Sequence, residues 1–188
     1  MRLFAAVTPP SRVLDHLAAA IAAVRDDRPA LRWSVREQWH ITLAFYGELA
    51  PERLPALARR LARAAGRTPP LDLALTGGGA FPRPERAHVL WADVRGDLRG
   101  LRRLAESAAA AGRRLGVPPD RKPYRPHLTL ARCRTPTDLS DVVAGLDAVD
   151  GGRWRAGELR LVRSHLGPSP SYETLHAWPL DGGRGSPQ

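Results

Sequence analysis

The sequence predicts an α+β fold with two similar lobes, each an antiparallel sheet with helices on its outer face. Segments of strand and helix character are interleaved, but without a regular strand–helix–strand repeat. The pattern His-x-Thr-Leu occurs twice, at residues 40–43 and 127–130, in opposite halves of the 188-residue chain. This repeat predicts a pseudo-twofold relation between the lobes, a central cleft, and one two-lobed domain over residues 1–188.

The expected strands are short runs of β-branched, aromatic and other apolar residues bounded by glycine, proline or polar clusters. They cover residues 3–7, 31–35, 40–46, 71–76, 87–94, 127–133, 158–166 and 172–180. The triple glycine at 77–79 lacks the context of a phosphate-binding loop, so we expect a turn there. The glycine-containing tail at 182–188 is expected to be disordered.

The expected helices have apolar residues at helical spacing. They cover residues 11–24, 51–65, 98–115 and 138–149. Glycine and proline at 66–70 and 116–119 end the second and third of them.

The bulk composition is that of a soluble globular domain, with 43% hydrophobic and 26% charged residues. Cys133 is the only cysteine, so no intramolecular disulfide can form. The N-terminal residues do not have the pattern of a signal peptide, and no stretch approaches the roughly 18 apolar residues of a membrane span. We therefore expect a cytoplasmic, monomeric protein that does not contact membranes.

The net charge is +10, with 29 basic residues against 19 acidic ones, and all of the basic residues except Lys122 are arginine. Such a surface can serve solubility alone. It can also attract a polyanion, because the planar guanidinium pairs well with phosphate. The charge by itself leaves both interpretations open.

The repeated motif places one histidine and one threonine on the same face of each strand, because side chains alternate along a strand. His40 and Thr42 face one way in the first copy, as do His127 and Thr129 in the second. The intervening and following apolar residues fit a buried face. If the lobes are related by a twofold axis, both polar pairs converge on one cleft.

Two histidines on opposite sides of a phosphorus atom suit in-line displacement. One can remove a proton from the entering oxygen and the other can deliver a proton to the leaving oxygen, since histidine titrates near neutral pH. Threonine hydroxyls can stabilise the charge that develops on the non-bridging oxygens. A metal site is the main rival interpretation, but no acidic or cysteine partners stand at ligand spacing around either motif.

These residues resemble the two-histidine (2H) phosphoesterase superfamily, and within it the RNA 2′,3′-cyclic phosphodiesterases, also called 2′-5′ RNA ligases. The resemblance covers nearly the whole chain and rests on the segments RLFAAVTPP, WHITLAFYGEL, GGGAFPRPERAHVLWADV, RPHLTLAR and LVRSHLGPSPSYETLHAWPL. It implies a bilobal fold with both motifs lining the cleft. It also implies hydrolysis of an RNA 2′,3′-cyclic phosphate to a 2′-phosphate without a metal or other cofactor.

The resemblance assigns roles to individual residues. It makes His40 the proton donor and His127 the proton acceptor, with Thr42 and Thr129 holding the phosphate. Arg132 matches an arginine that the family places at the phosphate. However, Arg132 has the opposite strand parity from His127, so it reaches the cleft only if the strand ends or bulges near Ala131, or if it approaches from the edge.

Three further residues near the motifs are candidates for substrate binding. Phe45 and Tyr46 end the first motif strand, where an aromatic ring could stack on a base. For Phe45, core packing is the favoured role. Arg125 belongs to the loop Arg121–Arg125, which leads into the second motif. This loop could guide an RNA backbone or simply be a solvated basic loop.

Other functions remain open at this point. Reversible 2′-5′ ligation would use the same site, with an RNA 5′-hydroxyl in place of water. A basic RNA-binding module without important turnover is a hypothesis of a different class, and intact proton-transfer residues in both motifs argue against it. Related small cyclic phosphates are alternative substrates.

Overall fold

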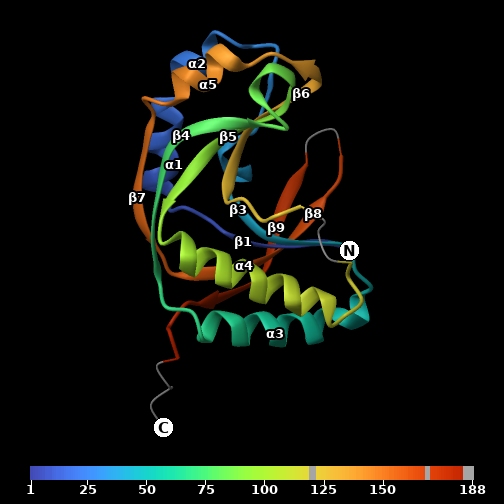
Figure 1. Cartoon of the computed structure of the whole chain (residues 1–188). Helices are drawn as coiled ribbons and strands as arrows, with labels where there is room; N and C mark the ends of the chain where they lie inside the picture. Colours follow the sequence, from blue (N-terminus) through green and yellow to red (C-terminus); the bar gives the residue numbers. More distant parts are fainter. Residues whose placement is uncertain (119–121, 168–169, 184–188) are drawn as a thin grey trace.

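Nine strands form one sheet in the computed structural model of the chain, which describes residues 1–118, 122–167 and 170–183 (Figure 1). The strands are β1 (Arg2–Val7), β2 (Arg32–Trp33), β3 (Ile41–Glu48), β4 (Leu71–Phe81), β5 (Ala87–Gly96), β6 (His127–Thr137), β7 (Asp150–Ala156), β8 (Glu158–His165) and β9 (Ser171–Pro179). The α-helices are α1 (Ser11–Ala20), α2 (Ala22–Asp26), α3 (Leu54–Gly66), α4 (Leu98–Arg113) and α5 (Ser140–Leu146). Short 3₁₀ turns occupy Arg36–Gln38, Pro51–Arg53 and Pro84–Arg86.

The sheet is antiparallel and its order is β7-β4-β5-β6-β3-β1-β8-β9, with β2 beside β6. The two motif strands, β3 and β6, are therefore neighbours at its centre. Their ladder contains a single register pair, Ile41 opposite Leu128. The expected pair of separate sheets is thus wrong: this one pair joins two four-stranded arms into a continuous sheet.

The connection from the inner neighbour to the motif strand is similar in the two arms. Next to β3 lies β1, which comes before it in the sequence, and next to β6 lies β5, which comes before that strand. The helix between each such pair packs on the opposite arm, since α1 contacts β7 and α4 contacts β3. Because the helices cross in this way, residues of both arms contribute to one shared core.

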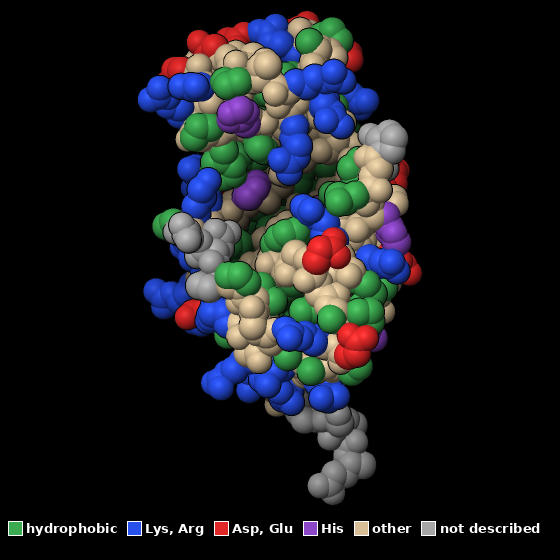
Figure 2. Space-filling view, turned by 90° about the vertical axis from the view of Figure 1, so that its right-hand side faces the viewer, with side chains coloured by type: hydrophobic (Ala, Val, Ile, Leu, Met, Phe, Trp, Pro, Cys, Tyr) green, Lys and Arg blue, Asp and Glu red, His purple; other side chains and the backbone are tan. Residues whose placement is uncertain are grey.

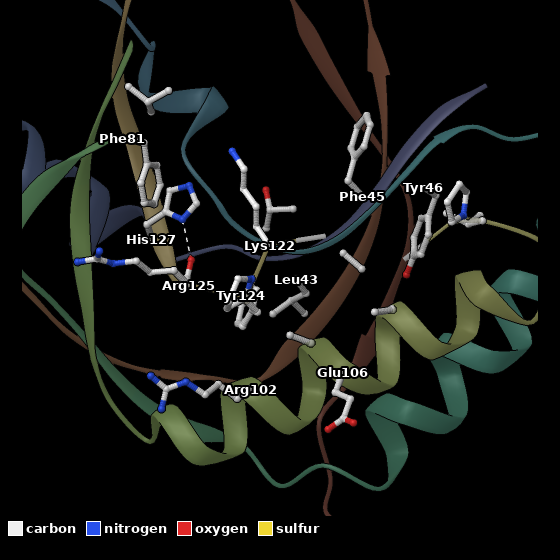
Figure 3. Close-up of a pocket in the computed structure, with 18 of the residues that line it drawn as sticks. Leu43, Phe45, Tyr46, Phe81, Arg102, Glu106, Lys122, Tyr124, Arg125 and His127 are labelled. Carbon is white, nitrogen blue, oxygen red and sulfur yellow. Dashed lines mark hydrogen bonds between the residues drawn. The ribbon is translucent and has the colours of Figure 1, made fainter. Parts of the chain in front are cut away.

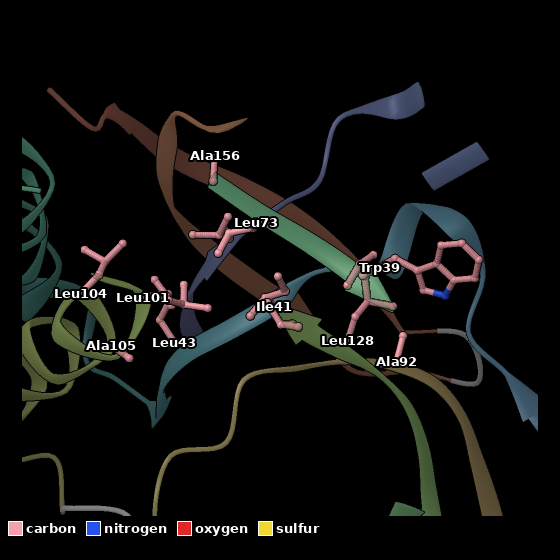
Figure 4. Close-up of a cluster of buried hydrophobic side chains, with 14 of the residues drawn as sticks. Trp39, Ile41, Leu43, Leu73, Ala92, Leu101, Leu104, Ala105, Leu128 and Ala156 are labelled. Atoms are coloured by element: carbon pink, nitrogen blue, oxygen red, sulfur yellow. The ribbon is translucent and has the colours of Figure 1, made fainter. Parts of the chain in front are cut away.

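The core lies between the sheet and its helices (Figure 4). Ile41 and Leu128 are fully buried at its centre, and Leu101 and Leu104 of α4 pack into it from the helix side. Burying each such side chain contributes roughly 1.5–3 kcal/mol. The opposite face of the same strands is therefore free to carry polar groups.

The triple glycine does not form the expected turn, because β4 runs through it to Phe81. Its pairing with β5 shifts register between Leu75 and Gly78. A Cβ atom at Gly78 would lie 2.6 Å from the Trp91 carbonyl oxygen, and one at Gly79 would clash with the Trp91 ring. The glycines are thus needed where Trp91 crosses close to the strand.

Strand β7 was not predicted, because Asp150-Gly151-Gly152 at its start is typical of a turn. It pairs with β4 over its length. The predicted helix at 138–149 is correspondingly shorter, and the predicted helix at 11–24 ends at Ala20 before continuing as α2.

The chain beyond Asp181 was expected to be disordered, but Gly182 donates its backbone N–H to the Thr68 carbonyl at 3.1 Å. Residues 184–188 of that expectation lie outside the described part. Within the described ranges, no helix has the length and apolar character required to cross a bilayer.

Candidate active site

Both motif histidines are held by the same backbone contact. The His40 Nδ1 lies 2.7 Å from the Gln38 carbonyl oxygen, and the His127 Nδ1 lies 2.8 Å from the Arg125 carbonyl oxygen. In each case the partner is two residues earlier in the chain. A carbonyl oxygen can only accept, so Nδ1–H donates in both rings and Nε2 is left to exchange protons.

The motif threonines have different contacts. The Thr42 Oγ1 lies 3.1 Å from the His40 Nε2, so the hydroxyl can donate to this nitrogen while the ring is neutral. Thr129 is half-buried on β6, opposite Trp91 of β5. The strand parity predicted for each His–Thr pair is consistent with this placement, because Ile41 and Leu128 between them point into the core.

Both motif strands contain a bulge at the leucine of the motif. In β3, Leu43 is skipped in the pairing with β1, where Ala5 is opposite Ala44 and Ala6 is opposite Thr42. In β6, Leu130 is skipped in the pairing with β5, where Leu90 is opposite Ala131 and Trp91 is opposite Thr129. An extra residue on one strand reverses which face the following side chains occupy.

The bulge explains how Arg132 reaches the cleft. Because Leu130 is the extra residue, Leu130 and Ala131 are both buried in the core. The next residue, Arg132, therefore lies on the same face as Thr129, although regular alternation would place it on the other face. Opposite it on β5 is Val89, which lines the large cavity beside the motifs. The positive charge of Arg132 contributes to lowering the pKa of both His40 and His127.

Phe45 occupies the equivalent position in the first motif, five residues after its histidine. It is opposite Phe4 in the ladder, and its side chain is 49% exposed on the cleft face. The Arg2 guanidinium lies 4.8 Å from the centre of its ring. Core packing, the favoured role for Phe45, is therefore wrong, and the ring is available for stacking.

Tyr46 lies in the core instead. Its side chain is buried, and its hydroxyl donates to the Ala108 carbonyl of α4 at 3.1 Å. Burial raises the pKa of the Tyr46 hydroxyl. A buried and tethered ring of this kind can form part of a cavity wall, but it cannot stack face-on with a base.

The two histidines have different neighbours. His40 stacks on Phe4 with a centroid distance of 4.6 Å, and the Tyr172 ring meets it edge-on at 5.2 Å. His127 meets the Phe81 ring edge-on at 4.9 Å and lies 6.2 Å from the Trp91 ring. All four aromatic residues lie in segments that carry the family resemblance, but strand alternation within the two motifs gives no sign of their contacts with the histidines.

Arg125 contributes to the surroundings of His127 through both its backbone and its side chain. Its carbonyl accepts the hydrogen bond from His127 (Figure 3), while its guanidinium lies 4.4 Å from the centre of the Trp91 ring. A cation over an aromatic face is stabilised by the ring quadrupole. In the same loop, Arg121 lies outside the described residues, and Lys122 lines the neighbouring cavity.

The pKa of both histidines is lowered, chiefly because burial disfavours the charged ring. The pKa of His40 falls to about 4, with His127 and Arg132 adding to the effect and the bond to Gln38 opposing it. The pKa of His127 is lowered by burial, Arg132 and Arg125, against the bond to the Arg125 carbonyl. Both rings are therefore neutral at pH 7 in the absence of an anion.

A cavity of about 1150 Å³ extends from the motifs toward α4 (Figure 3). Thr42 and His127 lie on its wall, together with aromatic and basic side chains. These include Phe45, Phe81, Arg102, Lys122, Tyr124 and Arg125. Its size and mixed lining suit an organic ligand with a negatively charged end.

The outer surface around the site is basic. Figure 2 shows a hollow with a histidine side chain inside it and lysine and arginine side chains along its rims. Among the described residues, no group of three or more histidine, cysteine, aspartate or glutamate side chains could hold a metal ion.

Comparison with known proteins identifies relatives along most of the chain. The family model of the 2′-5′ RNA ligase superfamily matches residues 13–168. An RNA 2′,3′-cyclic phosphodiesterase of Thermus thermophilus is 36% identical, and the match covers 100% of this chain and 94% of the relative. An enzyme of the same name from Geobacillus stearothermophilus is 31% identical over 82% of this chain, which spans about half of that longer protein, 49%.

Solved structures agree with the sequence relatives. A crystal structure of a Thermus thermophilus protein superimposes with a TM-score of 0.83 at 33% identity, covering 98% of this chain and 100% of that one. Escherichia coli LigT in complex with 3′-AMP gives a TM-score of 0.74 at 27% identity, covering 95% and 97% of the two chains. With the paired histidine motifs at the centre of the shared fold, the chain belongs to the 2′-5′ RNA ligase superfamily of 2H phosphoesterases.

Proposed function

We propose that the chain hydrolyses RNA 2′,3′-cyclic phosphate ends to 2′-phosphates, with His40 as proton donor and His127 as proton acceptor. The observation that carries this proposal is the matched anchoring of the two rings. Each presents Nε2 from a neighbouring central strand, with Nδ1 fixed by the carbonyl two residues earlier. Two such groups in one cleft are the requirement for general acid–base catalysis on a phosphodiester.

The proposed hydrolysis requires no metal ion, because the two histidines carry out both proton transfers. A water oxygen bonds to phosphorus while the bond from phosphorus to the 3′-oxygen breaks. His127 Nε2 takes the proton of the water, and His40 Nε2 gives a proton to the departing 3′-oxygen. The product carries a 2′-phosphate and a free 3′-hydroxyl, and the pair has transferred one proton in total.

The lowered pKa of His40 opposes its role as proton donor, since the donor must be protonated. A pKa of about 4 leaves the ring neutral in the empty cleft, so the donor form is a minor one at neutral pH. A cyclic phosphate carries a negative charge, which favours the protonated ring and offsets the effect of Arg132. Binding of the substrate anion thus raises the pKa of the group that must supply the proton.

The phosphate is held by Arg132 and the two threonines in this proposal. Arg132 offers a guanidinium whose planar donors fit two phosphate oxygens. Once the phosphate binds and His40 is protonated, the Thr42 hydroxyl no longer donates to His40 Nε2 and becomes free to bond a non-bridging oxygen. Thr129 supplies the matching hydroxyl from β6.

The nucleoside that bears the cyclic phosphate fits the cavity beside His127. Its volume of about 1150 Å³ accommodates a nucleoside, and its wall includes the exposed ring of Phe45. The names of the relatives support RNA ends as the substrate, and the LigT complex with 3′-AMP supports nucleotide binding in this fold.

A second use of the same site is ligation, in which an RNA 5′-hydroxyl replaces water and forms a 2′-5′ bond as the bond from phosphorus to the 3′-oxygen breaks. The family description supports this as a second activity. It needs no further residue, because His127 takes the proton of the attacking 5′-hydroxyl and His40 protonates the departing 3′-oxygen, as in hydrolysis.

The test is to incubate the pure protein with an RNA that ends in a 2′,3′-cyclic phosphate and to identify the terminal phosphate of the product. We expect only the 2′-phosphate, with water oxygen incorporated. His127→Ala should form the product about 10²- to 10⁴-fold more slowly, whereas His16→Ala, a change at an exposed histidine of α1, should behave as wild type. Tight binding with no change in the RNA end would instead indicate a binding module.

A further inference from the structure

Strand β2 places a second arginine beside Arg132. Arg32 is directly opposite Arg132 in the β2–β6 ladder, and Trp33 is opposite Ala131. Residues directly opposite in an antiparallel pair project from the same face, with Cβ atoms about 4.5–5.5 Å apart. Trp33 packs against the core, so its neighbour Arg32 projects from the other face, which is the cleft face.

The pairing places two like charges on neighbouring strands, and no ion pair among the described residues compensates either of them. Neither guanidinium is among the ion pairs of the described chain, although Arg28 pairs with Asp141 and Arg36 with Asp15 nearby in sequence. Like charges directly opposite on a sheet destabilise it. Two exposed arginines kept side by side in this way fit an anionic ligand better than they fit the free protein.

The two arginines lie at different depths relative to the histidines. The charge of Arg132 lowers the pKa of both His40 and His127, so Arg132 is close to the reacting phosphate. Arg32 lies one strand further along, on the side of β6 that faces away from β5. The cavity for the nucleoside, in contrast, extends on the side of α4.

We propose that Arg32 forms a second phosphate subsite, which binds the phosphodiester on the 5′ side of the terminal nucleoside. This rests on the proposed function and adds to it the substrate class: an oligonucleotide end rather than a mononucleotide. Arg132 holds the cyclic phosphate, and Arg32 holds the phosphate one nucleotide earlier. Basic side chains on the rims of the hollow in Figure 2 extend the positive electrostatic potential of the two arginines.

The experiment compares two substrates that differ only in this phosphate. One is a nucleoside 2′,3′-cyclic phosphate, and the other is a dinucleotide that ends in the same cyclic group. Arg32→Gln should lower kcat/KM for the dinucleotide by about 10-fold, the size expected for one charge-assisted phosphate contact. The mononucleotide should be hydrolysed at the wild-type rate. Arg32→Lys, which keeps the charge, should recover part of the loss.

Salt dependence gives a second measurement. For longer RNA, the slope of log affinity against log salt should become shallower by about 0.7 in Arg32→Gln, as expected for one lost contact to a single strand. Arg59→Gln on the outer helix α3 removes the same charge from an exposed position and should leave both substrates and the slope unchanged. The melting temperature of Arg32→Gln should not fall, because a like charge opposite Arg132 is removed.

Two outcomes would overturn the subsite. An equal loss on both substrates would make Arg32 part of the reacting-phosphate site, and equal rates for the variant and wild type on the dinucleotide would leave it no role. If wild-type protein hydrolysed neither substrate, the proposed function would fail instead. Binding of the dinucleotide to wild type and Arg32→Gln would then still decide whether Arg32 contacts the phosphate.

Discussion

The two motif strands share a bulge and a histidine anchor, yet a different side chain occupies the cleft-facing position beyond each bulge. Five residues after its histidine, the first motif presents Phe45 to the cleft, and the second presents Arg132. His40 stacks on Phe4, meets the Tyr172 ring edge-on and has a pKa of about 4, whereas His127 has Arg125 beside it. Similar backbone arrangements thus carry unlike side chains at matching positions: an exposed aromatic ring after His40 and a guanidinium after His127.

The largest expected effect comes from breaking either half of the histidine pair. His40→Ala and His127→Ala should each lower kcat by about 10²- to 10⁴-fold, the usual contribution of general acid–base catalysis. The double variant should lose far less than the product of the two, because the residues act as a unit. Steady-state rates with circular dichroism of each variant provide the check. A folded variant that kept more than about a tenth of wild-type turnover would show that the two halves do not cooperate.

The next effect separates the two positions beyond the bulges. Arg132→Gln should lower kcat/KM by about 100-fold, as for a lost charge-assisted contact. Because its positive charge lowers the pKa of both histidines, its removal raises both, and the pH profile of kcat/KM should shift to higher pH. Phe45→Ala should raise KM without moving the profile. A shift of equal size in both variants would contradict the division of roles between the halves.

The threonines allow a finer comparison. Thr42→Ala and Thr129→Ala should each cost about 10- to 100-fold in kcat, since each removes a hydroxyl that stabilises charge on the phosphate. Thr42 also contacts His40, so only its removal should alter the pKa of His40 as seen by NMR titration of the free protein. Serine at either position, which keeps the hydroxyl, should restore most of the rate.

The smallest expected effect is that of a chelator. Proton transfer between two histidines requires no metal, so hydrolysis should continue at an unchanged rate in excess EDTA. The measurement is an initial rate before and after extended dialysis against the chelator. A large loss that a divalent ion restored would replace the two-histidine mechanism with a metal-assisted one.

The sequence was informative where side chains follow a regular period. The His–Thr faces of both motifs follow from simple alternation, and so does the burial of Ile41 and Leu128. Strand β7 and the glycines of β4 were missed, because Asp-Gly-Gly and Gly-Gly-Gly are typical of turns. In the folded chain these segments form strands because β4 pairs with β5 and β7, and Trp91 of β5 lies close against the glycines of β4.

The direction of side chains after a bulge was the other feature that the sequence did not predict. The sequence indicated that Arg132 needed an irregular strand, and the structure places the irregularity at Leu130. No feature of the sequence indicated the matching bulge at Leu43, which turns Phe45 outward. A single unpaired residue changes no composition or hydropathy, so such features are determined only by pairing between strands.

The strand order also has a consequence for how the molecule is made. The arm around His127 is built from β4, β5, β6 and β7, which are contiguous over residues 71–156, whereas the arm around His40 joins β1 and β3 to β8 and β9 near the other end of the chain. On the ribosome, the His127 arm can therefore pair its strands while β1 still lacks its neighbour β8. Closure of the long loop between β1 and β8 should come last and set the pace of folding. We expect nascent chains that stop before residue 158 to lack both β8 and β9, and with them the neighbour of β1 and the Tyr172 contact to His40.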